Sequence, residues 1–314
     1  MPERDNNSAL TAPEVADMLK IAKNTVYELI KRGEINCYKV GRKVRFTRAD
    51  VEQYIARARQ GLAVFEERAP ERAMPRFDRE GGFIIAGQDV MLDILSHYLA
   101  RHPWGRPALR AHIGSYNGLT ALYRGEVQAA SVHLWDGDSG EYNRPYVRRL
   151  LPGIRTLIIR LTLRTQGLYV AAGNPRKIEG WADFGRQDLT MINRELGAGS
   201  RVLLDEHLRL RGLSSRDIRG YEREGQSHHA VASAVGRGEA DLAVGHQKAA
   251  EQVSGLDFIP LQKEQYDLVL KKDDLNRPMV RALMEILRST DFRREFEPMA
   301  GYDLSGLGEI VAET

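Results

Sequence analysis

Residues 192–208 read INRELGAGSRVLLDEHL and place four small residues between an arginine and an amphipathic run. The Gly-Ala-Gly-Ser segment, which includes Gly199, lets the backbone approach a ligand closely. A helix that begins near Ser200 also exposes its first N–H groups and the positive end of its dipole. Such a corner favours an anion, to which Arg194 and Arg201 can donate charge-assisted hydrogen bonds. The alternative is a tight turn in which Ser200 only caps the helix.

Two further corners between a strand and a helix have the same character. AGQD at 86–89 follows the apolar run FII, GSYN at 114–117 follows ALRAHI, and each leads into a helical pattern. In open α/β sheets ligands bind at the carboxyl ends of strands, so the three corners predict one cleft for an anion or another polar ligand. The candidate residues at these two corners are Gln88, Asp89, Ser115, Tyr116 and Asn117.

A weak internal repeat indicates two similar α/β units. YRGEVQAASVH at 123–133 aligns with GRGEADLAVGH at 236–246, with Arg, Gly, Glu, Ala and His in register. Each copy is typical of a helix end, a glycine turn and a buried strand that ends at a histidine. Two such units in one domain predict two lobes. His133, which ends the first copy, is a candidate cleft residue, with a buried core histidine as the alternative.

The first 60 residues have the pattern of a DNA-binding domain. They carry 12 Lys and Arg against 8 Asp and Glu, whereas the rest of the chain carries 34 against 35. Thr11 and Glu14 have the spacing of a capping box and predict a first helix, and KNTVYELIKRG predicts a second helix that ends at Gly33. INCYKV and KVRFT predict a two-stranded wing, and Thr47 opens a third helix.

The outward face of the second helix and the wing suit different parts of a DNA duplex. We expect the helix to read base edges and the wing, which has no acidic residue between 41 and 48, to contact phosphates. The alternative is a small helical domain with solvated charges. Residues 9–56 resemble the winged helix-turn-helix of the excisionase family, which is related to that of mercury-resistance-type regulators. The DNA-binding candidates are residues expected on the outward face of the second helix or in the wing, together with those implied by the matching positions of that family. They are Lys23, Asn24, Thr25, Tyr27, Lys31, Arg42, Lys43 and Arg45.

A second resemblance covers about residues 82–304. The segments QGLYVAAGNPRKIEGWADF, INRELGAGSRVLLDEHL and GYEREGQSHHAVASAVGRGEADLAVGH resemble the periplasmic-binding-protein-like domain often attached to helix-turn-helix domains and to molybdopterin biosynthesis proteins. The resemblance implies a type II binding-protein fold of two lobes joined by crossover strands, related to proteins that bind molybdate and tungstate. By position it implies ligand contacts at Gln88, Ser115, Arg194, Ser200, Arg201 and His228.

Two departures from the pattern of that family bear on the ligand. Where the motif commonly reads Asn-Arg-Gln and Gly-Ser-Gly-Thr-Arg, this chain has Glu195 and Gly-Ala-Gly-Ser-Arg. Glu195 repels a neighbouring anion unless its side chain turns away or pairs with an arginine. His228 and His229 have no Asp or Glu at metal-ligand spacing, so we expect no metal site. We expect His228 to donate a hydrogen bond to the ligand, with a plain surface histidine as the alternative.

The composition of the chain limits the classes of protein to which it can belong, and local changes in composition indicate its domain boundaries. The single cysteine, Cys37, excludes an internal disulfide and fits a reducing compartment. The first residues lack the apolar core of a signal peptide, and no run approaches the roughly 18 apolar residues of a membrane span. We therefore expect a cytoplasmic α/β protein. Its expected parts are a winged helix-turn-helix over 1–60, a charged, proline-containing linker over 61–81, and a two-lobed type II periplasmic-binding-protein-like domain over 82–314, with the second lobe at about 172–260.

Together these features predict a one-component transcription regulator that senses a small oxyanion. Molybdate and tungstate are the first candidates, and sulfate or an organic anion is the alternative. A single small reader makes few phosphate contacts, so we expect a homodimer on double-stranded DNA. We expect no cofactor and no catalysis, because no activated nucleophile is evident and the Gly-rich loop lacks the lysine of a P-loop. The competing hypotheses are an enzyme or binding module for a phosphorylated or molybdopterin-like ligand, and an excisionase-like recombination accessory factor.

Overall fold

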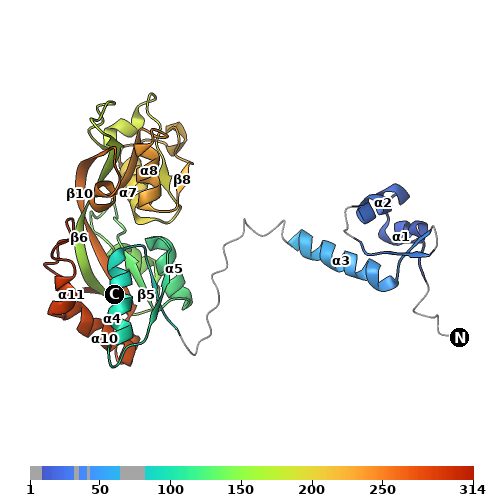
Figure 1. Ribbon diagram of the computed structural model, residues 1–314, viewed down its shortest axis with the longest axis horizontal. Helices are drawn as coiled ribbons and strands as arrows, with labels where there is room; N and C mark the ends of the chain where they lie inside the picture. Colours follow the sequence, from blue (N-terminus) through green and yellow to red (C-terminus); the bar gives the residue numbers. More distant parts are fainter. Residues whose placement is uncertain (1–8, 32–34, 41–42, 64–81) are drawn as a thin grey trace. The chain divides into compact units, whose positions relative to one another are not determined.

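A computed structural model describes residues 9–31, 35–40, 43–63 and 82–314 of the chain. The chain divides into two units, residues 1–75 and 76–314, and each is described by itself (Figure 1). None of the helices within the described ranges is both long and apolar enough to cross a membrane.

The N-terminal unit combines three helices with a short antiparallel hairpin. Its core includes Val15 on the first helix, Val26 on the second and Val51 on the third, and Phe46 packs among them, fully buried. The hairpin aligns Tyr38 with Arg45. The elements are α1 (Ala12–Leu19), α2 (Lys23–Lys31), β1 (Tyr38–Val40), β2 (Lys43–Arg45) and α3 (Arg48–Ala63).

The local signals of this unit are confirmed where the structure describes them. Thr11 caps α1, and Glu14 completes the capping box with hydrogen bonds to the Thr11 backbone and hydroxyl. These bonds lower the pKa of the Glu14 carboxyl. Gly33 and Arg42 lie outside the described residues. The helix α3 continues through residues 61–63, the first part of the predicted linker, and residues 64–81 are not described.

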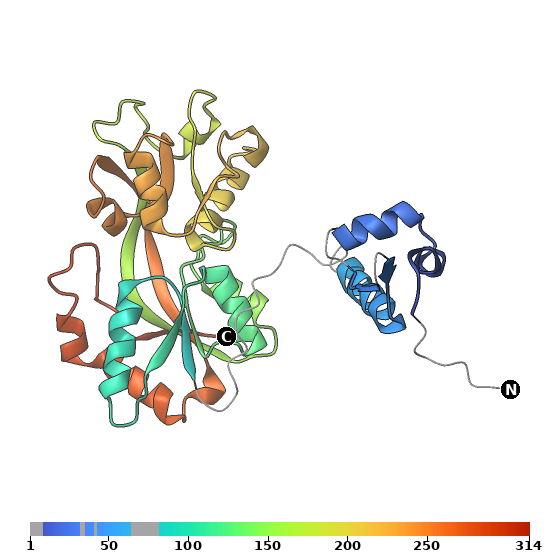
Figure 2. The ribbon, with the colours of Figure 1, turned by 45° about the vertical axis from the view of Figure 1, so that its right-hand side comes forward.

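Two long antiparallel strands organise the larger unit. β6 (Thr156–Ala171) and β10 (Leu256–Lys271) pair along their whole length and run through both lobes (Figures 1 and 2). The pairing register shifts between Pro260 and Gln262 and again between Tyr266 and Asp267. Between these shifts Arg164 lies opposite Glu264, so a charged pair stands at the middle of the two strands.

The first lobe is a mixed sheet covered on both faces. The strand order is β11-β6-β10-β5-β3-β4, and β3, β4 and β5 are parallel to one another. Right-handed crossovers from β3 out to β4, and from β4 back to β5, put α4 and α5 on opposite faces. The elements are β3 (Phe83–Ala86), α4 (Val90–Arg101), β4 (Ala108–Ala111), α5 (Ser115–Arg124), β5 (Ala129–Val132), α6 (Arg144–Leu150), the 3-10 turn η3 (Lys272–Asp274), α10 (Pro278–Arg288), α11 (Thr290–Arg294) and β11 (Ile310–Glu313).

The second lobe lies between the two long strands in the sequence. Its strand β9 pairs with the far half of β6, and its apolar clusters surround Leu204 on one side and Val231 on the other. The predicted two-lobed architecture is thereby confirmed. The elements are the 3-10 turn η1 (Trp181–Gly185), β7 (Asn193–Arg194), α7 (Gly199–Leu210), the 3-10 turn η2 (Ser215–Asp217), β8 (Glu224–Gly225), α8 (His228–Gly236), β9 (Leu242–His246) and α9 (Gln247–Glu251).

Candidate functional site

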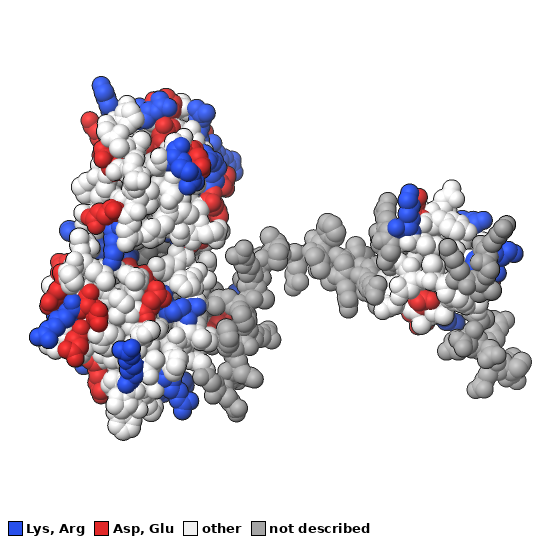
Figure 3. All heavy atoms as spheres, viewed as in Figure 1, with Lys and Arg blue, Asp and Glu red and all other residues white. Residues whose placement is uncertain are grey.

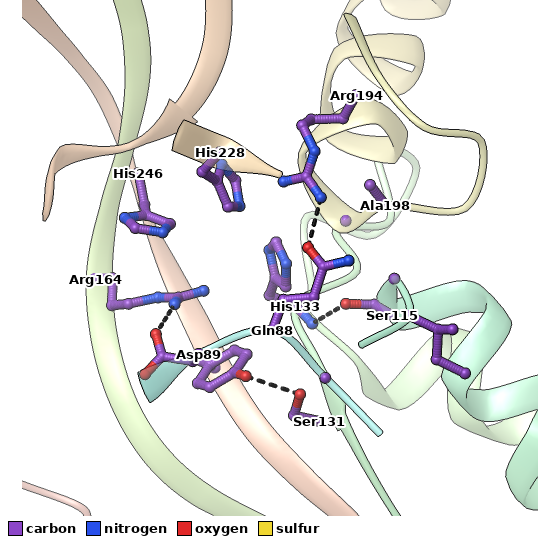
Figure 4. A pocket seen from close by; sticks show the side chains of 15 residues that line it. Gln88, Asp89, Ser115, Ser131, His133, Arg164, Arg194, Ala198, His228 and His246 are labelled. Atoms are coloured by element: carbon purple, nitrogen blue, oxygen red, sulfur yellow. Dashed lines mark hydrogen bonds and ion pairs between the residues drawn. The ribbon is translucent and has the colours of Figure 1, made fainter. Parts of the chain in front are cut away.

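A small polar cavity lies where the two lobes meet. Its empty volume is about 360 Å³, which includes space that is open to solvent. This size fits a ligand of a few heavy atoms. The residues that line it are Gly87, Gln88, Asp89, Ile113, Gly114, Ser115, Ser131, His133, Arg164, Arg194, Ala198, Gly199, His228, His246 and Tyr266 (Figure 4).

Four helices of nine or more residues begin at this cavity. α4 begins just after Asp89 and α8 begins at His228, and the side chains of Asp89 and Ser227 cap these two helices. The N-caps of α5 and α7 are Gly114 and Ala198, and neither supplies a side-chain cap. Both of these N-caps line the cavity. The positive ends of two helix dipoles therefore face the cavity without a side-chain cap, as suits an anion.

A buried charge network forms the floor of the cavity. Arg164 contacts Asp89 and Glu264 at 2.5 Å each, and Gln166 donates to the other oxygen of Glu264 at 2.6 Å. The hydroxyl of Tyr302 donates to Asp89 at 2.7 Å. Burial raises the pKa of a carboxyl, but the attraction of Arg164 outweighs it, so the pKa values of Asp89 and Glu264 both lie below their ordinary range.

Arg194 projects into the cavity from the second lobe, and its side chain is only 3% exposed. Its Nε and Nη2 each donate to the carboxylate of Glu195 at 2.8 Å, and Nη2 also donates to the amide oxygen of Gln88 at 2.6 Å. Glu195 thus pairs with an arginine, one of the two arrangements that reduce its repulsion of an anion. Among the described residues, Nη1 of Arg194 has no hydrogen-bond partner.

Three histidines line the cavity, and their surroundings differ. His246 accepts the N–H of Ala249 through Nδ1, so its proton is on Nε2. Burial and the positive charge of Arg164 lower the pKa of His246 to about 3, and burial with the positive charge of Arg194 lowers the pKa of His228 well below its ordinary value. The Nδ1 of His228 is buried and has no partner among the described residues. His133 instead contacts the carboxylate of Glu264 through Nδ1 at 2.8 Å.

The structure brings together seven of the eleven ligand residues that the sequence predicted. They come from all three predicted corners, from the end of the first repeat copy and from the start of α8. The seven are Gln88, Asp89, Ser115, His133, Arg194, Gly199 and His228.

The other four predicted residues lie beside the cavity and outside its lining. Tyr116 is 39% exposed, and Asn117 donates to the carbonyl of Leu196 at 3.1 Å. Arg201 turns away to Glu224 and to its own lobe's Arg194 carbonyl. Ser200 is buried and has no hydrogen-bond partner within the described part of the chain, and the N-cap of α7 is Ala198, so the alternative in which Ser200 caps the helix is wrong.

The cavity also contains polar residues that the sequence analysis missed. Arg164 lies, with Arg160, within the largely apolar run TLIIRLTLRTQG, and a charged residue in such a strand is a signal of a buried functional group. His246 ends the second repeat copy, so its alignment with His133 pointed to the same place. Ser131 and Tyr266 bond to each other at 2.8 Å and had no comparable signal.

The N-terminal unit presents the predicted face of its second helix. Val26 and Leu29 are buried, whereas all five DNA-binding candidates on α2 are exposed: Lys23, Asn24, Thr25, Tyr27 and Lys31. Lys43 on β2 is exposed and Arg45 is half-buried. On the larger unit, by contrast, Figure 3 shows basic and acidic side chains interspersed over the visible face.

Comparisons with known proteins agree with both parts of this architecture. The family model of the PBP superfamily domain matches residues 96–288, and that of a helix-turn-helix domain matches residues 9–59. An uncharacterized protein of Bacillus subtilis, YvgK, is 41% identical over 311 residues, which cover 99% of this chain and all of that protein. A Clostridium pasteurianum protein, uncharacterized and encoded in the 5' region of a ferredoxin 2Fe-2S gene, is 55% identical over 112 residues, or 36% of this chain and 99% of that protein.

Among solved structures, the fold is similar to that of an ABC-type phosphate transport receptor from Vibrio cholerae. The TM-score is 0.50 at 14% identity, and the match covers 71% of this chain and 99% of that one. This likeness concerns the fold alone. The matched family model spans more than half of the chain, and the Bacillus subtilis relative is similar from end to end. The chain therefore belongs to the PBP superfamily domain family, and it carries a helix-turn-helix domain before that domain.

Proposed function

We propose that this chain is a one-component transcription regulator whose larger unit senses a small oxyanion, with molybdate or tungstate as the first candidates. The observation that carries the proposal is the cavity itself. It is small, it lies at two helix N-termini that lack a side-chain cap, and it holds the Nη1 of Arg194 and a buried Nδ1 of His228 that have no partner among the described residues.

The cavity is built so that a ligand contacts both lobes at once. Gln88, Ser115 and His133 come from the first lobe, and Arg194, Gly199 and His228 come from the second. A ligand that binds both sets stabilises one arrangement of the lobes relative to others. We propose that this arrangement changes the affinity of the helix-turn-helix unit for DNA, which makes the two sites allosterically coupled.

The N-terminal unit supplies the other half of the proposal. The exposed face of α2, with Lys23, Asn24, Thr25, Tyr27 and Lys31, enters the major groove, and Lys43 and Arg45 contact phosphates together with Arg42, which lies outside the described residues. The protein binds as a homodimer, because two half-sites double the phosphate contacts of one small reader. Both matched domains are of kinds found in binding and regulatory proteins, and we propose no catalytic reaction.

The test measures thermal unfolding of the full chain with molybdate, tungstate, sulfate and phosphate. An oxyanion at 100 times its dissociation constant stabilises the folded state by about 2.7 kcal/mol. Arg194→Gln removes a charged donor from the cavity, and we expect it to weaken binding by about 1.5–3 kcal/mol. Arg219→Gln, an exposed arginine of the same lobe, is the matched control and retains full affinity.

The proposed coupling between oxyanion and DNA binding is tested with a DNA duplex that is first selected from random sequences by its binding to the protein. The affinity of the protein for this duplex is measured with and without the oxyanion. We expect the oxyanion to change this affinity, and we expect Arg194→Gln to abolish the change. If none of the four oxyanions shifts the unfolding temperature, the proposed ligand class is wrong. If an oxyanion binds but DNA affinity stays the same, the sensing role is wrong.

A further inference from the structure

The charges around the cavity do not favour a doubly charged anion by themselves. Two guanidinium groups, Arg164 and Arg194, stand in a network with three carboxylates, Asp89, Glu195 and Glu264. With neutral histidines these five groups taken alone carry one negative charge in excess. Placing a dianion beside buried groups that are already negative in sum costs a large electrostatic free energy, unless a positive charge is added with the dianion.

His133 is placed to supply that charge. Its Nδ1 contacts the carboxylate of Glu264 at 2.8 Å, so Nδ1 carries a proton that it donates to Glu264. The other ring nitrogen, Nε2, is then the atom that can gain or lose a proton. The ring lies in the cavity (Figure 4) and packs on Gly199, where an added Cβ would come within 2.7 Å of Nε2. A neutral His133 presents a lone pair at Nε2, and a protonated one presents a donor.

The other two histidines of the cavity lack this carboxylate contact. His246 uses Nδ1 as an acceptor for the Ala249 N–H, and the ring of His228 lies tilted by 57° to that of His246, with the centroids 4.3 Å apart. The charged groups that line the cavity around His133 are Glu264 from β10, Arg164 from β6, Arg194 from β7 and Asp89 from the N-cap of α4. Of these, only Glu264 is in direct contact with the His133 ring, and Tyr266, a further titratable group, packs edge-on against that ring with the centroids 5.8 Å apart.

We propose that His133 takes up one proton when the site binds an oxyanion that carries none, so that the anion and the proton bind together. The inference rests on the proposed function and identifies a residue that determines which ligands bind well. Molybdate, tungstate and sulfate bring no proton at neutral pH, so His133 takes one from solvent. Hydrogen phosphate brings its own proton, which it can donate to the Nε2 of neutral His133 without uptake from solvent.

The test is titration calorimetry of the full chain at pH 8, where an ordinary imidazole is neutral, in two buffers that differ in their heat of ionisation. The difference in measured heat gives the number of protons taken up per anion. We expect about one proton for molybdate and fewer for phosphate. By linkage, the affinity for molybdate then falls about tenfold for each unit of pH above neutrality.

Two variants assign the proton to its residue. His133→Gln cannot titrate, so its proton count with molybdate falls to near zero and its affinity loses most of the pH dependence. His246→Gln is the matched control, because it removes a histidine of the same cavity that stays neutral. Its affinity falls, but its proton count stays near one.

The outcomes separate this inference from the proposed function. If molybdate binds the wild-type chain without proton uptake, the role of His133 is wrong and the oxyanion sensor stands. An uptake that persists in His133→Gln has the same meaning. If no oxyanion binds at any pH, both proposals are wrong.

Discussion

The helix-turn-helix unit and the cavity of the larger unit present positive charge in opposite ways. Lys23, Lys31 and Lys43 are exposed, and none forms an ion pair with a described residue. Arg164 and Arg194 are buried, and each contacts carboxylates at 2.5–2.8 Å. Exposed, unneutralised cations suit a polyanion such as DNA, which releases its counterions on binding. Buried, neutralised cations suit a small ligand that is selected by the geometry of its donors.

The largest effect that tests this comparison is expected at Arg164. Arg164→Met leaves Asp89 and Glu264 buried without their cation, and removing one partner of a buried pair costs about 3–5 kcal/mol of unfolding free energy. Arg176→Met is the control, because Arg176 pairs with Asp241 at a half-exposed site, where the cost is about 1 kcal/mol or less. Urea unfolding followed by tryptophan fluorescence measures both, since all three tryptophans lie in the larger unit.

An equal loss of unfolding free energy in the two variants would show that Arg164 does not form a buried ion pair with Asp89 and Glu264. The comparison between the two units would then lose its physical basis.

An intermediate effect is expected on acidification. Because the pKa values of His228 and His246 are lowered, the unfolded chain binds protons below pH 6.5 that the folded chain does not bind. The contribution of these histidines to the free energy of unfolding is therefore complete above pH 6.5. It falls as the pH is lowered, by about 2 kcal/mol per histidine down to pH 5. His246→Gln removes the part of that loss that comes from His246, and His97→Gln, at an exposed site of the same unit, is the matched control.

Urea unfolding between pH 7 and pH 5 measures this loss. Asp89 and Glu264, whose pKa values are also lowered, add their own loss only as the pH falls below about 4.5, so the two ranges are separable. A stability that stays constant down to pH 5 would contradict the burial of neutral histidines in the cavity.

The sequence predicted those parts of the molecule whose cause is local. Thr11 and Glu14 are three residues apart and form the capping box that the spacing indicated. The repeat placed His133 and His246 at the ends of two buried strands, and both line the cavity. The three corners followed from the switch between an apolar strand and a helix, and residues of all three line the same cavity.

The charge network of the cavity could not be predicted in this way. Arg164 and Glu264 are 100 residues apart, and they meet only because β6 and β10 pair in the observed register. Tyr302 reaches Asp89 across 213 residues. Arg201 was expected at the ligand because of its spacing after the glycines, but its own lobe offers Glu224, and the ion pair turns the side chain away. These contacts depend on the packing of residues that are far apart in the sequence, which no local sequence pattern predicts.

The smallest effect, and the sharpest test of the comparison, concerns salt. The wing variant Arg42→Ala with Lys43→Ala removes two predicted phosphate contacts, so the slope of log affinity for DNA against log salt should become shallower by about 1.8. The same variant should leave oxyanion affinity unchanged. In the wild-type chain that affinity should vary less than about twofold between 50 and 200 mM salt, because screening acts weakly on buried charges. Fluorescence anisotropy with labelled duplex and calorimetry with the oxyanion measure the two slopes, and the double variant Arg176→Ala with Arg219→Ala controls for the loss of two charges elsewhere. Equal slopes for DNA and oxyanion would mean that the cavity binds by exposed charge, and the distinction between the two units would fail.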